Sequence, residues 1–209
     1  MLHKVSIIDY GMGNTWSVLS AFQFIGAKTE VVSEADELHN AECLVLPGVG
    51  SFKKAIYKIK EKSLDEAIIS SCNKGTKILG ICLGMQLLCL SSTEDGFNDG
   101  LSLVNGLVEK FDNEVIKKKL KVPHIGFNSV SIPAYSKLYN IDKTENDFYF
   151  VHSYRIKNLK DQRQIGVCEY GEKFVASFEI DNIFGTQFHP EKSQTNGLHL
   201  LKNFMDIKC

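Results

Sequence analysis

Cys82 lies at the centre of the pattern Gly-Ile-Cys-Leu-Gly (residues 80–84), which could make its thiol a nucleophile. The apolar residues 77–81 favour a buried strand, and the apolar run 85–90 favours a helix. A sharp turn between them would expose the thiol, as in the cysteine form of the nucleophile elbow. The glycines would remove Cβ atoms that clash with the tight backbone or a substrate, and the helix dipole would favour the thiolate. Taken alone, a buried core cysteine explains such a pattern more often.

A histidine and a glutamate that could activate this thiol follow in the pattern Phe-His-Pro-Glu at residues 188–191. His189 could act as general base toward Cys82, and Glu191 could orient the imidazole and stabilise its cation. Pro190 fixes one backbone dihedral between the two side chains. The pattern alone would indicate a surface turn. Together with the elbow, it predicts a catalytic triad of Cys82, His189 and Glu191.

A glycine turn, Leu-Pro-Gly-Val-Gly at residues 46–50, could stabilise the negative charge that develops during acyl transfer. It lies at the end of a predicted strand and ahead of a predicted helix, and its glycines leave backbone N–H groups free to point at an anion. A simple glycine turn is the alternative interpretation. We expect the two donors of an oxyanion hole to be the N–H groups of Val49 and of Leu83, the residue after the nucleophile.

The elements that must position these residues alternate between strands and helices in the first half of the chain. Strands are predicted at residues 5–9, 28–32, 43–46 and 77–81. One helix is predicted in the stretch that ends at residue 25, and another at residues 52–73. In the second half, strands at 103–109, 147–156, 164–170 and 174–188 precede an amphipathic helix at 193–207. The pattern predicts one α/β domain over residues 1–209, with a mostly parallel central sheet flanked by helices and a β-rich second half.

The composition excludes several classes of partner. Lys and Arg (24) nearly balance Asp and Glu (25), so no overall field favours nucleic acid or an anionic membrane surface. The apolar run near the N-terminus is too short for a signal sequence or a membrane span. The six cysteines lack metal-ligand spacing and indicate a reducing compartment. We therefore expect a cytoplasmic protein with no metal site.

Six segments together resemble the class I (triad) glutamine amidotransferases, and the likeness runs over nearly the whole chain. They are residues 8–14, 46–52, 80–88, 122–128, 150–154 and 187–193. The resemblance implies hydrolysis of glutamine to glutamate and ammonia, which a partner synthase then uses. It also implies that no metal and no organic cofactor takes part.

The resemblance assigns five residues to the glutamine pocket. Gly50, Gln86 and Glu94 would hold the substrate, and Ser153 and Tyr154 would line the same pocket. Glu94 would face the α-ammonium group, where a charge-assisted hydrogen bond is chemically sensible. Without the family, an exposed turn acid would be an equally good interpretation of Glu94. Two other histidines, at positions 124 and 152, are interpreted as structural.

Within the class, the likeness is closest to the ammonia-supplying subunits of histidine biosynthesis. That resemblance implies a heterodimer with a (βα)8-barrel cyclase or synthase subunit. Ile125 and Phe127 stand where those subunits usually have Met and Trp, so a paralogue that feeds amidino-sugar formation in surface polysaccharides is an alternative. A peptidase-like hydrolase and a noncatalytic subunit of the same fold are further alternatives. Both are disfavoured because the elbow, the 188–191 pattern and the 46–50 turn are all present.

Overall fold

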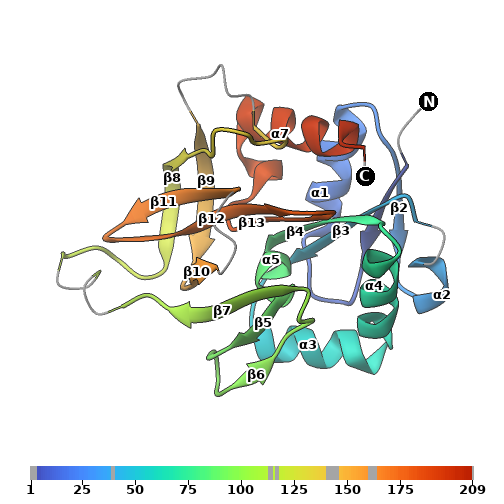
Figure 1. Cartoon of the computed structure of the whole chain (residues 1–209), viewed down its shortest axis with the longest axis horizontal. Helices are drawn as coiled ribbons and strands as arrows, with labels where there is room; N and C mark the ends of the chain where they lie inside the picture. The colour runs from blue at the N-terminus through green and yellow to red at the C-terminus, as the bar shows by residue number, and fades with distance from the viewer. Residues whose placement is uncertain are drawn as a thin grey trace.

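The computed structural model describes residues 4–38, 41–112, 115, 118–139, 146–159 and 164–208. Within these residues, thirteen strands join into one hydrogen-bonded sheet with helices on both sides (Figure 1). Its main path runs β2-β1-β3-β4-β13-β12-β10-β7-β5-β6, and β11, β8 and β9 branch from β12. The α/β architecture expected from the sequence is therefore confirmed.

The first half supplies the parallel part of the sheet. Its elements are β1 (Lys4–Ile8), α1 (Thr15–Phe24), β2 (Lys28–Val32), α2 (Ala35–Leu38), β3 (Cys43–Gly48), α3 (Phe52–Glu61), α4 (Leu64–Asn73), β4 (Lys77–Cys82) and α5 (Leu83–Leu87). β3 and β4 run parallel, and their register pairs Gly48 with Cys82. The glycine turn and the nucleophile candidate therefore emerge side by side from the same edge of the sheet.

The second half adds mainly antiparallel strands. These elements are β5 (Cys89–Ser92), β6 (Asn98–Asp99), β7 (Val104–Lys110), β8 (His124–Ser131), β9 (Asp147–His152), β10 (Tyr154–Leu159), β11 (Ile165–Tyr170), β12 (Glu172–Ile180), β13 (Ile183–Thr186), the 3₁₀ turn η1 (Pro190–Lys192) and α7 (Gln194–Asp206). β13 returns to the centre and pairs in parallel with β4. The chain that leaves β13 consequently reaches the edge where β4 ends.

Two apolar cores lie on opposite faces of the sheet because side chains alternate along each strand. In β3, Leu44 and Leu46 join the core beneath α3, α4 and α5, whereas Cys43 and Val45 join the core beneath α1 and α7. Figure 1 shows α1 and α7 together on one side of the sheet, and α3, α4 and α5 across from them. Burial on both faces explains the continuous apolar runs of the parallel strands.

Some predicted boundaries are wrong. The single helix expected at 52–73 is two helices, because Ser63 adopts a left-handed conformation with φ of 54°. The helix expected at 85–90 ends at Leu87, and Cys89 begins a strand. The strand expected at 174–188 is divided by a turn in which Asp181 has φ of 52°. The strand expected at 147–156 is divided at Ser153 into β9 and β10.

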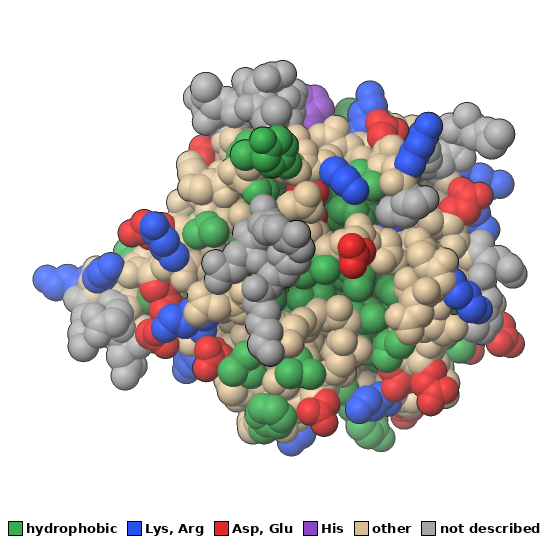
Figure 2. All heavy atoms as spheres, in the orientation of Figure 1, with side chains coloured by type: hydrophobic (Ala, Val, Ile, Leu, Met, Phe, Trp, Pro, Cys, Tyr) green, Lys and Arg blue, Asp and Glu red, His purple; other side chains and the backbone are tan. Residues whose placement is uncertain are grey.

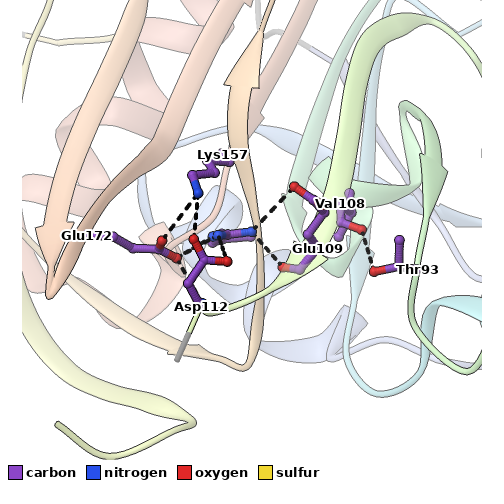
Figure 3. A network of polar contacts seen from close by, with 7 residues as sticks. Thr93, Val108, Glu109, Asp112, Lys157 and Glu172 are labelled. Atoms are coloured by element: carbon purple, nitrogen blue, oxygen red, sulfur yellow. Dashed lines mark hydrogen bonds and ion pairs between the residues drawn. The ribbon is translucent and has the colours of Figure 1, made fainter. Parts of the chain in front are cut away.

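A buried cation fastens the strand that follows Ser153. The Arg155 side chain is fully buried, and its Nε and Nη2 each lie 2.7 Å from Glu172 Oε1. Its Nη1 donates to the main-chain carbonyl of Glu109, and Asp112 lies 3.4 Å from Nη2. Figure 3 shows Lys157 on β10 and Glu172 on β12 converging with Glu109 of β7 and with Asp112, which follows that strand. The cluster holds β10 against β7 and β12, and so fixes the wall that carries Tyr154.

The surface is electrically mixed. Figure 2 shows lysine, arginine and acidic side chains interspersed around the visible face, without a continuous field of one sign among the side chains described there. No helix in the described part of the chain is long and apolar enough to cross a membrane.

Candidate active site

The backbone at Cys82 forms a strained turn between β4 and α5. Cys82 has φ of 55° and ψ of −109°, a combination that L-residues rarely adopt outside functional turns. A Cβ at Gly84 would lie 1.7 Å from the Leu46 carbonyl oxygen, and one at Gly80 would lie 2.7 Å from the Met85 backbone. Both glycines are thus required by the close approach of α5 to the strands. This is the geometry of a nucleophile elbow.

His189 and Glu191 form a buried hydrogen-bonded pair. His189 Nδ1 donates to Glu191 Oε1 at 2.8 Å, and both side chains are almost completely buried. The His189 main-chain N–H donates to the Tyr149 carbonyl, and Pro190 begins η1, which turns Glu191 back toward the ring. The other ring nitrogen, Nε2, has no hydrogen-bond partner among the described residues. It remains available to exchange a proton in the pocket that His189 shares with Cys82.

The electrostatics of the pair favour a charged imidazole. Burial alone would lower the pKa of His189, but the adjacent Cys82 thiol and the Glu191 carboxylate together raise that pKa to about 10. Around neutral pH the arrangement therefore favours the imidazolium form of His189. An imidazolium can donate a proton to a leaving group, and a thiolate is the nucleophilic form of cysteine.

The glycine turn lines the pocket, but the main-chain N–H of Val49 points away from it. Val49 lines the pocket, yet its N–H donates to the Met12 carbonyl oxygen at 3.4 Å. Gly50 has φ of 100°, a conformation that a side chain would strain. Leu83 is the first residue of α5, so its N–H has no intrahelical acceptor. Leu83 lines the pocket, whereas the N–H of Val49 is turned toward Met12.

A pocket of about 330 Å³ opens in front of Cys82. Every predicted site residue except Glu191 lines it, including Gly50, Gln86, Ser153 and Tyr154. Gln86 Nε2 donates to the Tyr154 main-chain carbonyl and to Gln187 Oε1, both at 2.9 Å. The Gln86 side-chain oxygen is therefore the end of this amide that can accept a hydrogen bond from a ligand.

Glu94 contributes both to the pocket and to a neighbouring helix. Its Oε2 accepts the Phe52 main-chain N–H at 2.8 Å, at the start of α3, where Ser51 makes no side-chain cap. Burial raises the pKa of Glu94, and the hydrogen bond from Phe52 opposes that shift. In turn, burial and then the Glu94 carboxylate raise the pKa of Tyr154, which places this negative charge close to the pocket wall.

Two histidines near the pocket form a neutral pair. His124 Nδ1 and His152 Nε2 lie 3.1 Å apart, and His152 Nδ1 lies 2.9 Å from the Tyr154 carbonyl oxygen. Burial lowers the pKa of His152 to about 3 and that of His124 to about 4. The contacts join β8, β9 and β10, as expected of structural histidines. No group of three or more potential metal ligands occurs in the described ranges.

Gln187 is a pocket-side residue that was not predicted from the sequence. Its side chain is completely buried, and its Nε2 lies 3.7 Å from Cys82 Sγ. Position 187 is two residues before His189, and alternate residues of an extended segment share a face. That spacing was the signal in the sequence that could have identified it.

A model of the family "Glutamine amidotransferase class-I" matches residues 6–207. The chain belongs to the class I glutamine amidotransferases, in the group of HisH glutaminase subunits of imidazole glycerol phosphate synthase. It is 43% identical over 208 residues to imidazole glycerol phosphate synthase subunit HisH 1 of Parasynechococcus marenigrum, with 99% of each chain covered. It is 45% identical over 201 residues to subunit HisH 1 of Campylobacter jejuni, with 96% of this chain and 98% of the relative covered.

Solved structures support the class I amidotransferase fold. A crystal structure described as a glutamine amidotransferase superposes with a TM-score of 0.74 at 14% identity, with 97% of both chains covered. A putative GMP synthase protein from Thermoplasma acidophilum gives a TM-score of 0.72 at 22% identity, and the match covers 99% of this chain and 94% of the other. At such identities, the similarity concerns the fold alone.

Proposed function

We propose that Cys82, His189 and Glu191 hydrolyse the side-chain amide of glutamine. The Cys82 thiolate attacks the amide carbon, and the electron pair of the C=O bond moves to oxygen. His189 then gives its proton to the nitrogen, which leaves as ammonia, and a γ-glutamyl thioester remains. Water attacks the thioester and gives a proton to His189, and glutamate leaves as the thiolate is restored. The proposal rests on the elbow at Cys82, which shares one pocket with the buried His189–Glu191 pair.

The oxyanion formed in each step requires two N–H donors. We assign the first to Leu83 and the second to Val49 after the peptide between Gly48 and Val49 has rotated. The rotation would exchange the long hydrogen bond to Met12 for one to the oxyanion. Gly48 before this peptide and Gly50 after Val49 make such a rotation sterically inexpensive.

The pocket accounts for the binding of glutamine. Glu94 is assigned to the α-ammonium group, and the free carbonyl oxygen of Gln86 accepts an N–H of the substrate. Gly50 leaves space for the ligand, and Ser153 and Tyr154 line the same pocket. These groups bind the substrate and orient its amide toward Cys82, while the chemistry needs no metal or organic cofactor.

Ammonia would pass to a (βα)8-barrel cyclase subunit docked as a heterodimer. The curated relatives are subunits of imidazole glycerol phosphate synthase, so a partner subunit belongs to the assembly. Ammonia is largely protonated at neutral pH, and a face-to-face complex would keep it from the solvent. We place the docking face at β8, where Ile125 is 60% and Phe127 52% exposed, next to Pro123 at the pocket.

We assign the protein to histidine biosynthesis and place it in the cytoplasm. Residues 1–209 form a single amidotransferase domain in this proposal. The amidino-sugar alternative predicts a different stimulating ligand. Glutaminase activity that rises only when the partner binds the nucleotide substrate of the histidine pathway would support the assignment. Stimulation by a sugar-nucleotide substrate instead would favour the polysaccharide paralogue.

The triad is tested with Cys82→Ala. Glutamine-dependent synthesis by the complex should be abolished, while synthesis from added ammonium salts should persist because the partner's chemistry is intact. Cys168→Ala is a control, since Cys168 is buried in β11, outside the pocket. Glutaminase activity near the wild-type rate in Cys82→Ala would refute the proposal.

A further inference from the structure

We propose that the side-chain amide of Gln187 donates a hydrogen bond to the Cys82 thiolate and fixes it for attack, a role that rests on Cys82 being the nucleophile. Gln187 Nε2 lies 3.7 Å from Cys82 Sγ, within the range of an N–H···S hydrogen bond. Gln187 is completely buried and Cys82 is only 6% exposed, so the side-chain amide of Gln187 is shielded from water. A charged acceptor roughly doubles the strength of such a bond.

The orientation of the Gln187 amide follows from one backbone carbonyl. The Tyr154 carbonyl oxygen can only accept, so Gln86 must turn its amino group toward it. The same amino group lies 2.9 Å from the Gln187 side chain, which must therefore present its oxygen there. Gln187 is left with its amino group facing Cys82. The donor direction thus follows from the network itself, although amide ends are often ambiguous.

The thiol has a competing partner that favours its protonated form. Cys82 Sγ lies 3.9 Å from the Val151 carbonyl oxygen, which can accept an S–H but would repel a thiolate. Gln187 has the opposite preference, because its N–H stabilises the anion. Loss of the Gln187 donor should therefore favour the thiol turned toward Val151.

The other ionisable groups around the sulfur leave this role to Gln187. His189 supplies the charged partner, and it must give up its proton during each turnover. His152 is neutral because burial lowers its pKa to about 3, and Tyr10 is neutral because burial raises its pKa. Gln187 carries no ionisable proton, so it still donates to the sulfur after His189 has released its proton.

The backbone holds Gln187 at this point independently of its side chain. Its main-chain N–H donates to the Ala176 carbonyl oxygen at 2.8 Å. Two substitutions therefore separate the roles of the amide. Gln187→Glu keeps the shape and an oxygen for Gln86, but it replaces the donor beside sulfur with a carboxylate. Gln187→Met keeps a similar volume and removes the donor without adding charge.

The test is the pH dependence of Cys82 alkylation by iodoacetamide, followed by mass spectrometry of the Cys82 peptide. Both substitutions should move the alkylation midpoint to higher pH, with Gln187→Glu shifted further. In the complex, kcat should fall about 10–100-fold, the range expected when a hydrogen bond to a charged group is lost. KM for glutamine should change little. Tyr139→Phe is the control for buried hydrogen-bond loss, since Tyr139 bonds to Ser177 away from the pocket.

Each outcome is decisive. An unchanged alkylation midpoint in both variants would overturn the role of Gln187, even if their melting temperatures fell as in Tyr139→Phe. If Cys82→Ala is inactive while both Gln187 variants titrate like the wild type, only the inference about Gln187 fails. If Cys82→Ala remains active, the proposed function itself fails.

Discussion

Glu94 has two roles at the residue scale, and one substitution separates them. Glu94→Gln keeps an oxygen that can accept the Phe52 N–H at the start of α3, but it removes the charge in the pocket. We expect KM for glutamine to rise about 10–100-fold, corresponding to loss of a hydrogen bond to a charged group of about 1.5–3 kcal/mol. Steady-state kinetics of the complex measure this.

The comparison with Glu94→Ala isolates the second role. Alanine should raise KM similarly and also lower the melting temperature, because loss of a helix cap costs about 0.5–2 kcal/mol. An unchanged KM in Glu94→Gln would place the ammonium site elsewhere in the pocket.

The buried histidine pair makes stability depend on pH. Burial depresses the folded-state pKa of His124 and His152, so the unfolded chain binds more protons below about pH 6.5. Stability is therefore fully present above that pH and falls as the pH decreases toward the folded-state values. Between pH 7 and pH 5, we expect about 1–2 kcal/mol to be lost per histidine.

Urea denaturation at the two pH values tests this expectation. His124→Gln should reduce the loss, because it removes one of the two buried imidazoles whose pKa is lowered by burial. Equal pH dependence in wild type and His124→Gln would contradict the assignment.

At the scale of elements, Arg155 determines how β10 is held. Arg155→Met should lower the free energy of unfolding by about 3–5 kcal/mol, because it leaves a mostly buried Glu172 without its cation. Lys157→Met removes an exposed cation from the same acidic groups and should lower the free energy of unfolding far less, because solvent screens its charge. Chemical denaturation of both variants distinguishes these results. Similar losses in the two would show that burial of Arg155 is not decisive.

The elements differed in how far the sequence could predict them. The turn at Cys82 was predictable because its glycines and its strand are contiguous in the chain. The breaks at Ser63 and Asp181 were not, because non-glycine residues with positive φ leave no periodic pattern. β8 was missed because much of it is exposed or half-buried and lacks a continuous apolar run. β5 was assigned to a helix because Cys89 and Leu90 continue the apolar run of α5.

For the site too, features set by neighbouring residues could be predicted from the sequence, whereas contacts between distant segments could not. All the predicted residues except Glu191 line one pocket, and Glu191 is hydrogen-bonded to His189. The contact between Gln187 and Cys82 depends on the parallel pairing of β13 with β4, which joins segments about a hundred residues apart. The Val49 N–H was expected in the pocket, but its direction is set by the distant Met12 carbonyl. Such relations are properties of tertiary structure.

At the scale of the whole molecule, the turned-away Val49 peptide predicts a slow enzyme in isolation. Removing one oxyanion donor typically lowers the rate about 10²–10³-fold. Glutaminase activity of the chain alone should therefore be lower by that order than in the complex with its partner and the partner's substrate. A ligand can shift the peptide only as far as it binds the competent state more tightly. Full activity of the isolated chain would exclude this form of control.

Lys77 links the two segments that carry the triad. Its buried ammonium, at the start of β4, donates to the carbonyl oxygens of Phe204, Met205 and Ile207 at the end of α7. β4 ends at Cys82, and α7 begins just beyond Glu191, so the contact fastens both segments at the ends remote from the pocket. The last turn of α7 cannot open without leaving this ammonium unpaired in the interior. The backbone amides of that turn and of β4 should therefore exchange hydrogen as one cooperative unit. The strand that bears the nucleophile opens only when the last turn of α7 opens.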